Sequence, residues 1–214
     1  MKVIITGATG MVGEGVLMEC LENKNVNEIL IVNRRHFDLS HPKLKELIVP
    51  DFTKLEQYAK ELTGYDACFY CAGISSVGMN ESDYTKITYD TTLYFAENLV
   101  HLNPEIIFNF VTGNLTDSTE KGKVMWARVK GKTENDLMKL SLKGQYNFRP
   151  GFMKPFKKQQ NVKWFFKPVV WIFPHLFPSR SLSLSEVGRA MIHSVLKGYP
   201  KQVLEIKNIR ELSK

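Results

Sequence analysis

A short β-branched run, a glycine-rich turn and an amphipathic run open this chain and constrain its fold most strongly. Residues 2–6 are the β-branched run, Gly7, Gly10 and Gly13 follow, and apolar residues recur at helical spacing over residues 12–21. This order predicts strand, turn and helix, the setting in which such glycines bind a dinucleotide. Gly7 would allow the tight turn, Gly10 would let backbone N–H groups approach a pyrophosphate, and Gly13 would permit close helix–strand packing.

The amino end of the predicted first helix is the expected anchor for that pyrophosphate. The first N–H groups of a helix have no partner within it, and the helix dipole favours an anion there. Thr9, Met11 and Val12 complete the turn around the glycines, and we count them among the cofactor contacts. The alternative interpretation is an ordinary glycine-rich loop between a strand and a helix.

The end of the second predicted strand indicates which nicotinamide nucleotide the chain prefers. Residues 28–32 run directly into Asn33, Arg34 and Arg35. An NAD site usually carries Asp or Glu at this place, bonded to the ribose 2′-OH. Arginine instead presents a fixed fork of donors that suits a 2′-phosphate. We therefore expect NADP(H) to be preferred over NAD(H). The alternative is a solvated pair of arginines at a strand end.

The composition is that of one soluble domain over residues 1–214. With 43% apolar residues the chain can bury a full core, and its apolar runs fall short of the roughly 18 residues that a membrane-spanning helix needs. We recognise no targeting segment, and three cysteines suggest a reducing compartment, so we expect a cytoplasmic protein. Cys68 and Cys71 lie three apart in a predicted strand, which directs them to opposite faces. We interpret both as buried structural thiols and expect no metal site.

Alternating strand and helix patterns predict the fold class. They indicate a Rossmann-like α/β protein, with a doubly wound parallel sheet and helices on both faces. Further strands are expected at residues 45–49, 67–71, 106–111 and 146–148. Helices are expected at residues 55–62, 83–102, 125–140 and 186–197, the last capped by Ser183 or Ser185.

These residues together resemble the short-chain dehydrogenase/reductase superfamily, in its extended or atypical branch. Residues 6–13 match that branch's glycine motif, and Asn33-Arg34 matches its NADP-preferring strand end. The likeness covers almost the whole chain and is to NAD(P)H-binding epimerase-like proteins and oxidoreductases of the Tat-interacting-protein type. Such proteins oxidise or reduce a carbinol or carbonyl, or epimerise or dehydrate nucleotide sugars. The resemblance also implies cofactor contacts at Asp51, Phe52, Cys71, Ala72, Gly73, Arg149, Pro150 and Gly151.

The chain departs from the superfamily at the catalytic helix. The superfamily carries Tyr-x-x-x-Lys there, preceded by Ser or Thr after the fifth strand, whereas this chain has Trp126, Lys130 and Thr112. Positions four apart share a helix face, so Lys130 can still bind the nicotinamide ribose, while Thr112 and Trp126 can position a substrate oxygen. An indole N–H has no usable acidity. A positioned acid–base group contributes about a hundred- to ten-thousand-fold in rate, so its loss puts conventional dehydrogenase chemistry in doubt.

Three interpretations of Trp126 stay open. Tyr70, Tyr89 or Asp117 could reach the site as the missing acid. The indole N–H could instead be a fixed donor to a developing oxyanion while water supplies the proton. The third interpretation is a protein that binds NADP(H) without turnover, as a sensor or scaffold. The function hypotheses are accordingly an NADP(H)-dependent oxidoreductase or epimerase-like enzyme and, alternatively, such a binder.

The charge is distributed unevenly along the chain. Residues 121–180 contain 14 Lys and Arg against 2 Asp and Glu, while residues 1–120 contain 9 against 17. A basic cleft mouth would favour an anionic small-molecule substrate, such as a nucleotide sugar or an acyl thioester. The alternative is a solvated face. No nucleic-acid-binding module accompanies the charge, so we expect no nucleic acid partner.

Lysines and aromatic residues are mixed over residues 152–178. We interpret residues 151–184 as a small C-terminal lid on the substrate side. Two alternatives stay open, a homodimer contact and a surface that rests on an anionic membrane, where basic and aromatic residues act together. If the segment contacts a partner, it is also the part through which a non-catalytic binder would act.

Overall fold

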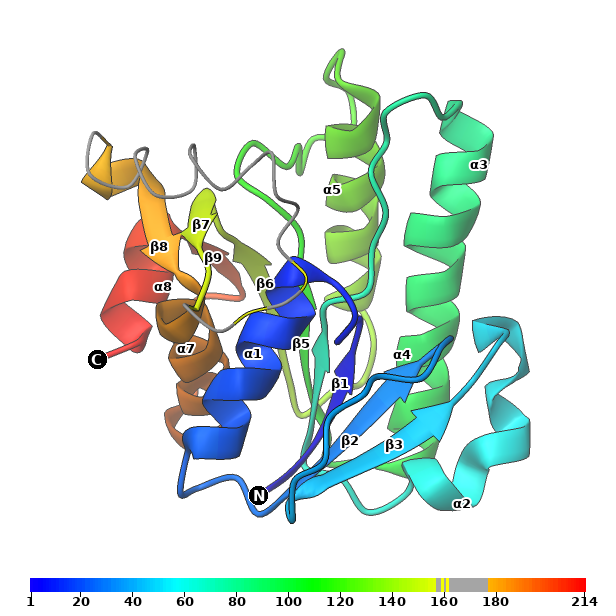
Figure 1. The fold of residues 1–214 in the computed structure, drawn as a ribbon. Helices are drawn as coiled ribbons and strands as arrows, with labels where there is room; N and C mark the ends of the chain where they lie inside the picture. Colours follow the sequence, from blue (N-terminus) through cyan, green and yellow to red (C-terminus); the bar gives the residue numbers. More distant parts are fainter. Residues whose placement is uncertain (157–158, 160, 162–176) are drawn as a thin grey trace.

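Parallel strands form the central sheet, and their order reverses once. The computed structural model describes residues 1–156, 159, 161 and 177–214. Over these residues the main sheet has seven strands in the order β3-β2-β1-β4-β5-β6-β9, each parallel to its neighbours (Figure 1). The order reverses between β1 and β4, which is where a doubly wound sheet binds its ligand. The strands are β1 (Lys2–Thr6), β2 (Glu28–Asn33), β3 (Leu44–Ile48), β4 (Ala67–Tyr70), β5 (Ile107–Val111), β6 (Gly144–Arg149) and β9 (Val203–Glu205).

The central strands are buried on both faces, and their alternate residues supply two cores. Ile4 belongs to one core with Cys68 and Phe108, whereas Ile5 belongs to the other with Phe69. This follows from the two-residue period of a strand, which sends neighbouring side chains to opposite faces. Near-continuous apolar runs are typical of parallel sheets covered on both sides.

Helices cover the two faces of the sheet in separate groups (Figure 1). One group is α1 (Met11–Glu22), α7 (Leu184–Lys197) and α8 (Ile206–Leu212). The other is η1 (Phe52–Tyr58), α2 (Ala59–Leu62), α3 (Glu81–Thr85), η2 (Lys86–Asp90), α4 (Thr91–Leu102) and α5 (Met125–Leu137). The predicted doubly wound α/β fold is therefore confirmed.

Several predicted element boundaries are corrected by the structure. The predicted helix 83–102 begins at Glu81 and contains a π-helical turn, η2, whereas the predicted helix 125–140 ends at Leu137. Of the two predicted caps for α7, Ser183 is correct, because its hydroxyl accepts from the N–H of Glu186 in a capping box. Cys68 is buried as predicted, but Cys71 is only half-buried, and the two lie against opposite cores.

A small second sheet follows β6 on the side of the predicted lid. It pairs β7 (Phe152–Lys154) with β8 (Ser181–Ser183), and the 3₁₀ turn η4 (Pro178–Arg180) precedes β8. Most of the aromatic residues on which the lid, dimer and membrane interpretations depend, Trp164, Phe165, Phe166, Trp171 and Phe173, lie outside the described residues. Across the described ranges, no helix combines the length and the apolar character that crossing a membrane requires.

Candidate functional site

A pocket of about 670 Å³ opens at the carboxyl ends of β1, β2 and β4. It lies beside the point where the strand order reverses, as expected for a dinucleotide site. Its walls include most of the predicted cofactor residues: Gly7, Thr9, Gly10, Asn33, Arg34, Arg35, Asp51, Phe52, Cys71, Ala72 and Gly73. Met11, Val12 and Gly13 lie beyond these walls, in the first turn of α1.

The glycine turn is held against the end of β4 so closely that a side chain at Gly7 has no room. Gly7 has a φ of +71°, and a Cβ there would lie 2.7 Å from the backbone nitrogen of Ala72. That nitrogen donates to the hydroxyl of Thr6 at 3.1 Å, which fastens β4 to the turn. A Cβ at Gly13 would lie 2.2 Å from the oxygen of Gly7, so the predicted close helix packing at Gly13 is confirmed.

Gly10 closes the turn through its backbone N–H. Its N–H donates to the oxygen of Gly7 at 2.9 Å, so it is already engaged. Among the described residues no side chain caps α1, and the N–H groups of the first helical turn have no carbonyl partner within the helix. An anion at this end of α1 would therefore be bound by Met11, Val12 and Gly13, the residues that follow Gly10.

A polar cluster organises the end of β2. Glu46 of β3 accepts from the side-chain nitrogen of Asn33 at 3.3 Å, from the N–H of Phe37 at 2.8 Å and lies 2.5 Å from the ring of His36. Asn33 is buried, and its Oδ1 has no partner among the described residues although Asn33 lines the pocket. Sequence reasoning missed Glu46, because a charged residue within a strand gives no sign of its neighbour across the sheet.

Arg34 and Arg35 are exposed at the pocket wall beside this cluster. Among the described residues, no carboxylate lies within ion-pair distance of either guanidinium. The bonds of Glu46 to His36 and Phe37 fasten the chain that follows the two arginines. Two unpaired guanidinium groups therefore stand beside a buried amide oxygen that lacks a donor.

Asp51 and Phe52 form the wall beyond β3. Asp51 caps η1, and its carboxylate accepts from the hydroxyl of Thr53 at 2.7 Å and from its N–H at 2.9 Å. The hydroxyl bond of Thr53 is the main reason that the pKa of Asp51 is lowered. Phe52 is buried and packs against Phe95, with ring centroids 5.3 Å apart.

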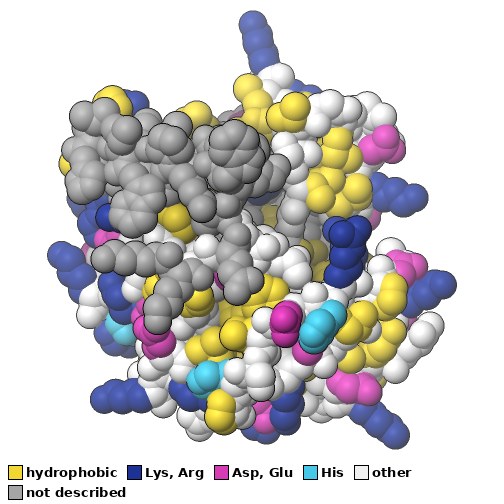
Figure 2. All heavy atoms as spheres, in the orientation of Figure 1, with side chains coloured by type: hydrophobic (Ala, Val, Ile, Leu, Met, Phe, Trp, Pro, Cys, Tyr) yellow, Lys and Arg dark blue, Asp and Glu magenta, His cyan; other side chains and the backbone are white. Residues whose placement is uncertain are grey.

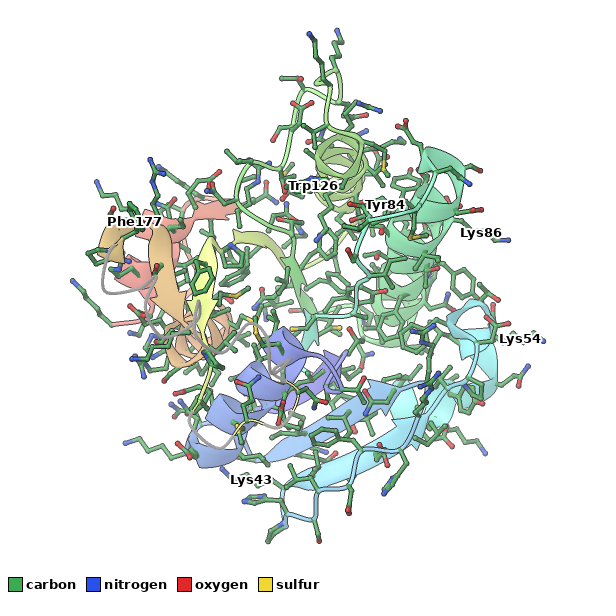
Figure 3. The ribbon with its side chains drawn as sticks, turned by 45° about the horizontal axis from the view of Figure 1, so that its top comes forward. Lys43, Lys54, Tyr84, Lys86, Trp126 and Phe177 are labelled. Atoms are coloured by element: carbon green, nitrogen blue, oxygen red, sulfur yellow. The ribbon has the colours of Figure 1, made fainter. Side chains whose placement is uncertain are left out.

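The predicted catalytic residues lie at the end of β5 rather than in the walls of this pocket. Figure 3 shows Trp126 on the first turn of α5, where α5 lies beside α3. Its indole is half-buried, and Gly113 lies so close that a Cβ there would be 3.9 Å from the Cζ3 of Trp126. Lys130, one turn further along α5, donates from Nζ to the backbone oxygen of Thr112 at 2.9 Å. Burial lowers the pKa of Lys130 to about 8.

The hydroxyl hydrogen of Thr112, which was expected to orient a substrate carbonyl, is directed to a neighbouring side chain instead. Its Oγ1 lies 2.6 Å from Oε1 of Glu134 and 3.2 Å from the backbone oxygen of Phe148. A hydroxyl has one hydrogen to donate. The Thr112 side chain therefore fastens α5 to the sheet, and the substrate-orienting role of Thr112 stays a prediction.

Arg149 is similarly engaged. Its Nε donates to Glu134 at 3.0 Å, and its two terminal nitrogens donate to Glu205 at 3.2 Å and to the hydroxyl of Ser118 at 2.5 Å. Each nitrogen of the guanidinium therefore already donates to another described residue. Pro150 contributes its backbone oxygen to the N–H of Asn114 at 2.9 Å. Gly151 lies so close to residue 180 that a Cβ would be 2.5 Å from the oxygen of Arg180.

None of the three alternative acids is placed as a ready proton donor beside Trp126. Tyr70 is buried in the pocket floor, and burial raises its pKa. The hydroxyl of Tyr89 donates to Asp136 at 2.7 Å, which raises the pKa of Tyr89. Asp117 accepts from Thr119 and from the N–H of residue 122, and the pKa of Asp117 is lowered, chiefly by the Thr119 hydroxyl.

Figure 2 shows how Lys and Arg side chains are distributed on one face, which concerns the expected basic cleft mouth. Most Lys and Arg side chains on this face lie around its outline, and one group lies inside it, right of centre. Several basic residues of 121–180 are also engaged: Arg128 pairs with Glu81 at 2.7 Å, and Lys132 and Lys139 both pair with Asp136. These pairs reduce the number of free cations that the sequence count suggested.

Fold and cleft together define a Rossmann-type dinucleotide-binding protein. The chain belongs to the NAD-dependent epimerase/dehydratase family, whose model matches residues 3–111. It is 25% identical over 219 residues to Protein HTATIP2 of Rattus norvegicus, and the match covers the whole of this chain and 89% of that protein.

Several solved enzyme structures share the fold. WbmF of Bordetella bronchiseptica, solved with NAD+, has a TM-score of 0.70 at 16% identity, over 99% of this chain and 76% of that one. The dTDP-glucose 4,6-dehydratase of Streptomyces venezuelae was solved as a double mutant with NAD bound. It has a TM-score of 0.70 at 16% identity, and the match covers 100% of this chain and 79% of that one. The UDP-glucose 4-epimerase of Thermotoga maritima has a TM-score of 0.69 at 15% identity, and the match covers 100% of this chain and 82% of that one.

Proposed function

We propose that this protein is an NADP(H)-dependent oxidoreductase or epimerase-like enzyme that acts on an anionic carbonyl or carbinol compound. The observation that carries the cofactor preference is the end of β2. Arg34 and Arg35 line the pocket there without a carboxylate partner among the described residues, and no acidic residue takes the position of Asn33. A carboxylate there would bind the ribose 2′-OH of NAD and repel a 2′-phosphate, whereas guanidinium groups attract it.

The residues around the pocket fit a dinucleotide. The turn at Gly7 leaves space that a Cβ would fill. In the described part of the chain the first N–H groups of α1 have no partner, and neither has the acceptor oxygen Oδ1 of Asn33. Met11 to Gly13 would hold the pyrophosphate through their N–H groups, and Asn33 with Arg34 and Arg35 would hold the adenosine ribose and its phosphate. When bound, the nicotinamide supplies or accepts a hydride.

Isothermal titration calorimetry with NADPH and NADH tests the cofactor preference. We expect the wild type to bind NADPH at least about tenfold more tightly, and Arg34→Ala/Arg35→Ala to lose that difference because a charged hydrogen bond contributes about 1.5–3 kcal/mol. Lys24→Ala is the control, since Lys24 is an exposed cation beyond the far end of α1. Equal affinities for the two nucleotides in the wild type would contradict the proposal.

A non-catalytic NADP(H) binder is the second candidate function. The observation that favours it is the engagement of Thr112 and Arg149 with Glu134, together with an indole in place of a phenol. NADPH oxidation measured over a panel of aldehydes and ketones separates the two candidates. Tight NADPH binding without turnover on any member of the panel favours the binder, whereas turnover that depends on Lys130 supports the enzyme.

A further inference from the structure

Two side chains of α5 flank the residues that follow β5. Trp126 and Lys130 are one helical turn apart and so share a face of the helix. A Cβ added at Gly113 would lie 3.9 Å from Cζ3 of Trp126, and Lys130 Nζ donates to the backbone oxygen of Thr112 at 2.9 Å. The indole of Trp126 and the ammonium group of Lys130 therefore both lie beside residues 112–113.

Other polar groups near this point have their hydrogens engaged. The hydroxyl of Thr112 is directed to Glu134 at 2.6 Å, and Arg149 donates to the same carboxylate. Glu134 is fully buried and accepts from both residues. Neither Thr112 nor Arg149 is therefore placed to give a proton to a substrate oxygen.

Lys130 differs from these groups because its charge lacks a direct partner. In the described part of the chain it makes no ion pair, and its one hydrogen bond is to a neutral carbonyl. An ammonium group has three N–H donors, so two remain for other partners. Burial lowers the pKa of Lys130 to about 8, against an opposing effect of Glu134. The group can therefore both release and regain a proton near neutral pH.

We propose that Nζ of Lys130 is the acid–base group that replaces the missing phenol, exchanging a proton with the substrate oxygen that the indole N–H of Trp126 holds. This inference rests on the proposed function. In the reducing direction a hydride from a reduced nicotinamide forms the new C–H bond, and the C=O π pair moves to oxygen. The oxygen forms an O–H bond as one N–H bond of the Lys130 ammonium breaks. The neutral amine then takes a proton from solvent, and oxidation reverses these changes.

Competitive labelling of the wild-type protein tests, without any variant, whether the pKa of Lys130 is lowered. Trace acetic anhydride is reacted with the protein at pH 6 to 11, and acetylation of each lysine is read by mass spectrometry of peptides. We expect labelling of Lys130 to rise with a midpoint near pH 8, well below that of Lys143, an exposed lysine in the same digest. Identical pH profiles for the two lysines overturn the inference.

The pH dependence of turnover tests the role in catalysis. NADPH oxidation with 4-nitrobenzaldehyde as the probe should fall about tenfold per pH unit above pH 8 in the wild type, because the protonated fraction of Lys130 falls by that factor. Lys130→Arg keeps the charge but does not titrate in this range, so its turnover should be at least about a hundredfold slower and independent of pH. Lys143→Met should keep the wild-type profile.

The outcomes separate this inference from the proposed function. If Lys130→Arg turns over with the same pH profile as the wild type, the inference is wrong, but the proposed oxidoreductase function is not contradicted. NADPH binding without turnover by the wild type, on this probe or on the wider carbonyl panel, overturns both. Calorimetry with NADPH and near-ultraviolet circular dichroism establish that Lys130→Arg is folded before its rate is interpreted.

Discussion

Glu134 of α5 and Arg149 of β6 form an ion pair enclosed by the protein: Glu134 is 0% exposed and Arg149 is 8% exposed. Arg149 donates to both oxygens of Glu134, at 3.0 and 3.2 Å from Nε, and its other nitrogens reach Ser118 and Glu205. The pair therefore joins the helix that carries Trp126 and Lys130 to the sheet. It is a positioning device for this helix, because neither charge is directed to the pocket.

Removing one member of this pair should destabilise the protein more than removing both. Glu134→Gln leaves the buried Arg149 guanidinium with only the exposed carboxylate of Glu205 as a counter-charge, and we expect about 3–5 kcal/mol of lost stability in urea unfolding. Glu134→Leu/Arg149→Met should lose less, because no buried charge remains. Glu81→Gln, which breaks the exposed pair with Arg128, is the control and should cost less than about 1 kcal/mol. Equal losses in Glu134→Gln and in the control would contradict this account of the pair.

Gly7→Ala should abolish cofactor binding, whereas Gly64→Ala should not. Both glycines have positive φ, +71° and +89°, so both substitutions carry the strain of a left-handed residue, about 1 kcal/mol. A Cβ at Gly7 also meets the backbone of residues 71 and 72, whereas one at Gly64 meets nothing within 4 Å. We expect Gly7→Ala to lower the melting temperature further and to bind no NADPH in calorimetry. Normal NADPH affinity in Gly7→Ala would show that the turn has room to move.

The cofactor turn could be predicted from the sequence because its information is local. Gly7, Gly13 and the capping of α7 by Ser183 each follow from contacts made within a few residues or from a standard strand–turn–helix unit. The same is true of the near-continuous apolar runs that specify the central strands of the sheet. Local patterns therefore predicted the fold and the part of the candidate site that the glycine turn between β1 and α1 forms.

The rest of the candidate site depends on pairings between distant residues. Thr112 and Glu134 are 22 residues apart, and Glu134 and Arg149 are 15 apart, so no spacing rule reveals that these three side chains bond to one another. Glu46 was missed for the same reason. The strand β9 has only three residues, and so short a run carries too little pattern to be recognised before its pairing with β6 is known.

Asn33→Asp combined with Glu46→Gln should shift the cofactor preference toward NADH. An aspartate at position 33 can accept from a ribose 2′-OH and repels a 2′-phosphate. The second change is needed because the side-chain nitrogen of Asn33 lies 3.3 Å from Glu46, where a second carboxylate would be repelled. We expect calorimetry to show a fall in NADPH affinity of about tenfold or more and a rise for NADH. Glu46→Gln alone serves as the control. An unchanged ratio of NADPH to NADH affinity in the double variant would contradict the assigned role of position 33.

Trp126→Tyr should raise carbonyl reduction if the remaining machinery is intact. A phenol at this position is one helical turn from Lys130 and restores the residue pattern that the superfamily uses. Because Lys130 already donates a proton near neutral pH, we expect the increase in NADPH oxidation to be largest above pH 8, where Lys130 loses its proton but a phenol keeps its own. Trp126→Phe, which supplies neither N–H nor O–H, is the control and should fall below the wild type. If Trp126→Tyr is no faster than Trp126→Phe, no substrate oxygen reaches this position.

Lys130→Met should make the protein more stable at pH 7 and should change how stability varies with pH. Burial lowers the folded-state pKa of Lys130 to about 8 from 10.5, so between these two pH values the unfolded chain binds more protons than the folded one. Stability therefore rises with pH across this window in the wild type, and the charged form costs the folded state its full penalty below pH 8. Urea unfolding of the wild type and Lys130→Met at pH 7, 8, 9 and 10 measures the difference. We expect the advantage of Lys130→Met over the wild type to shrink steadily above pH 8. An advantage that stays constant over this range would show that Lys130 is not desolvated in the folded protein.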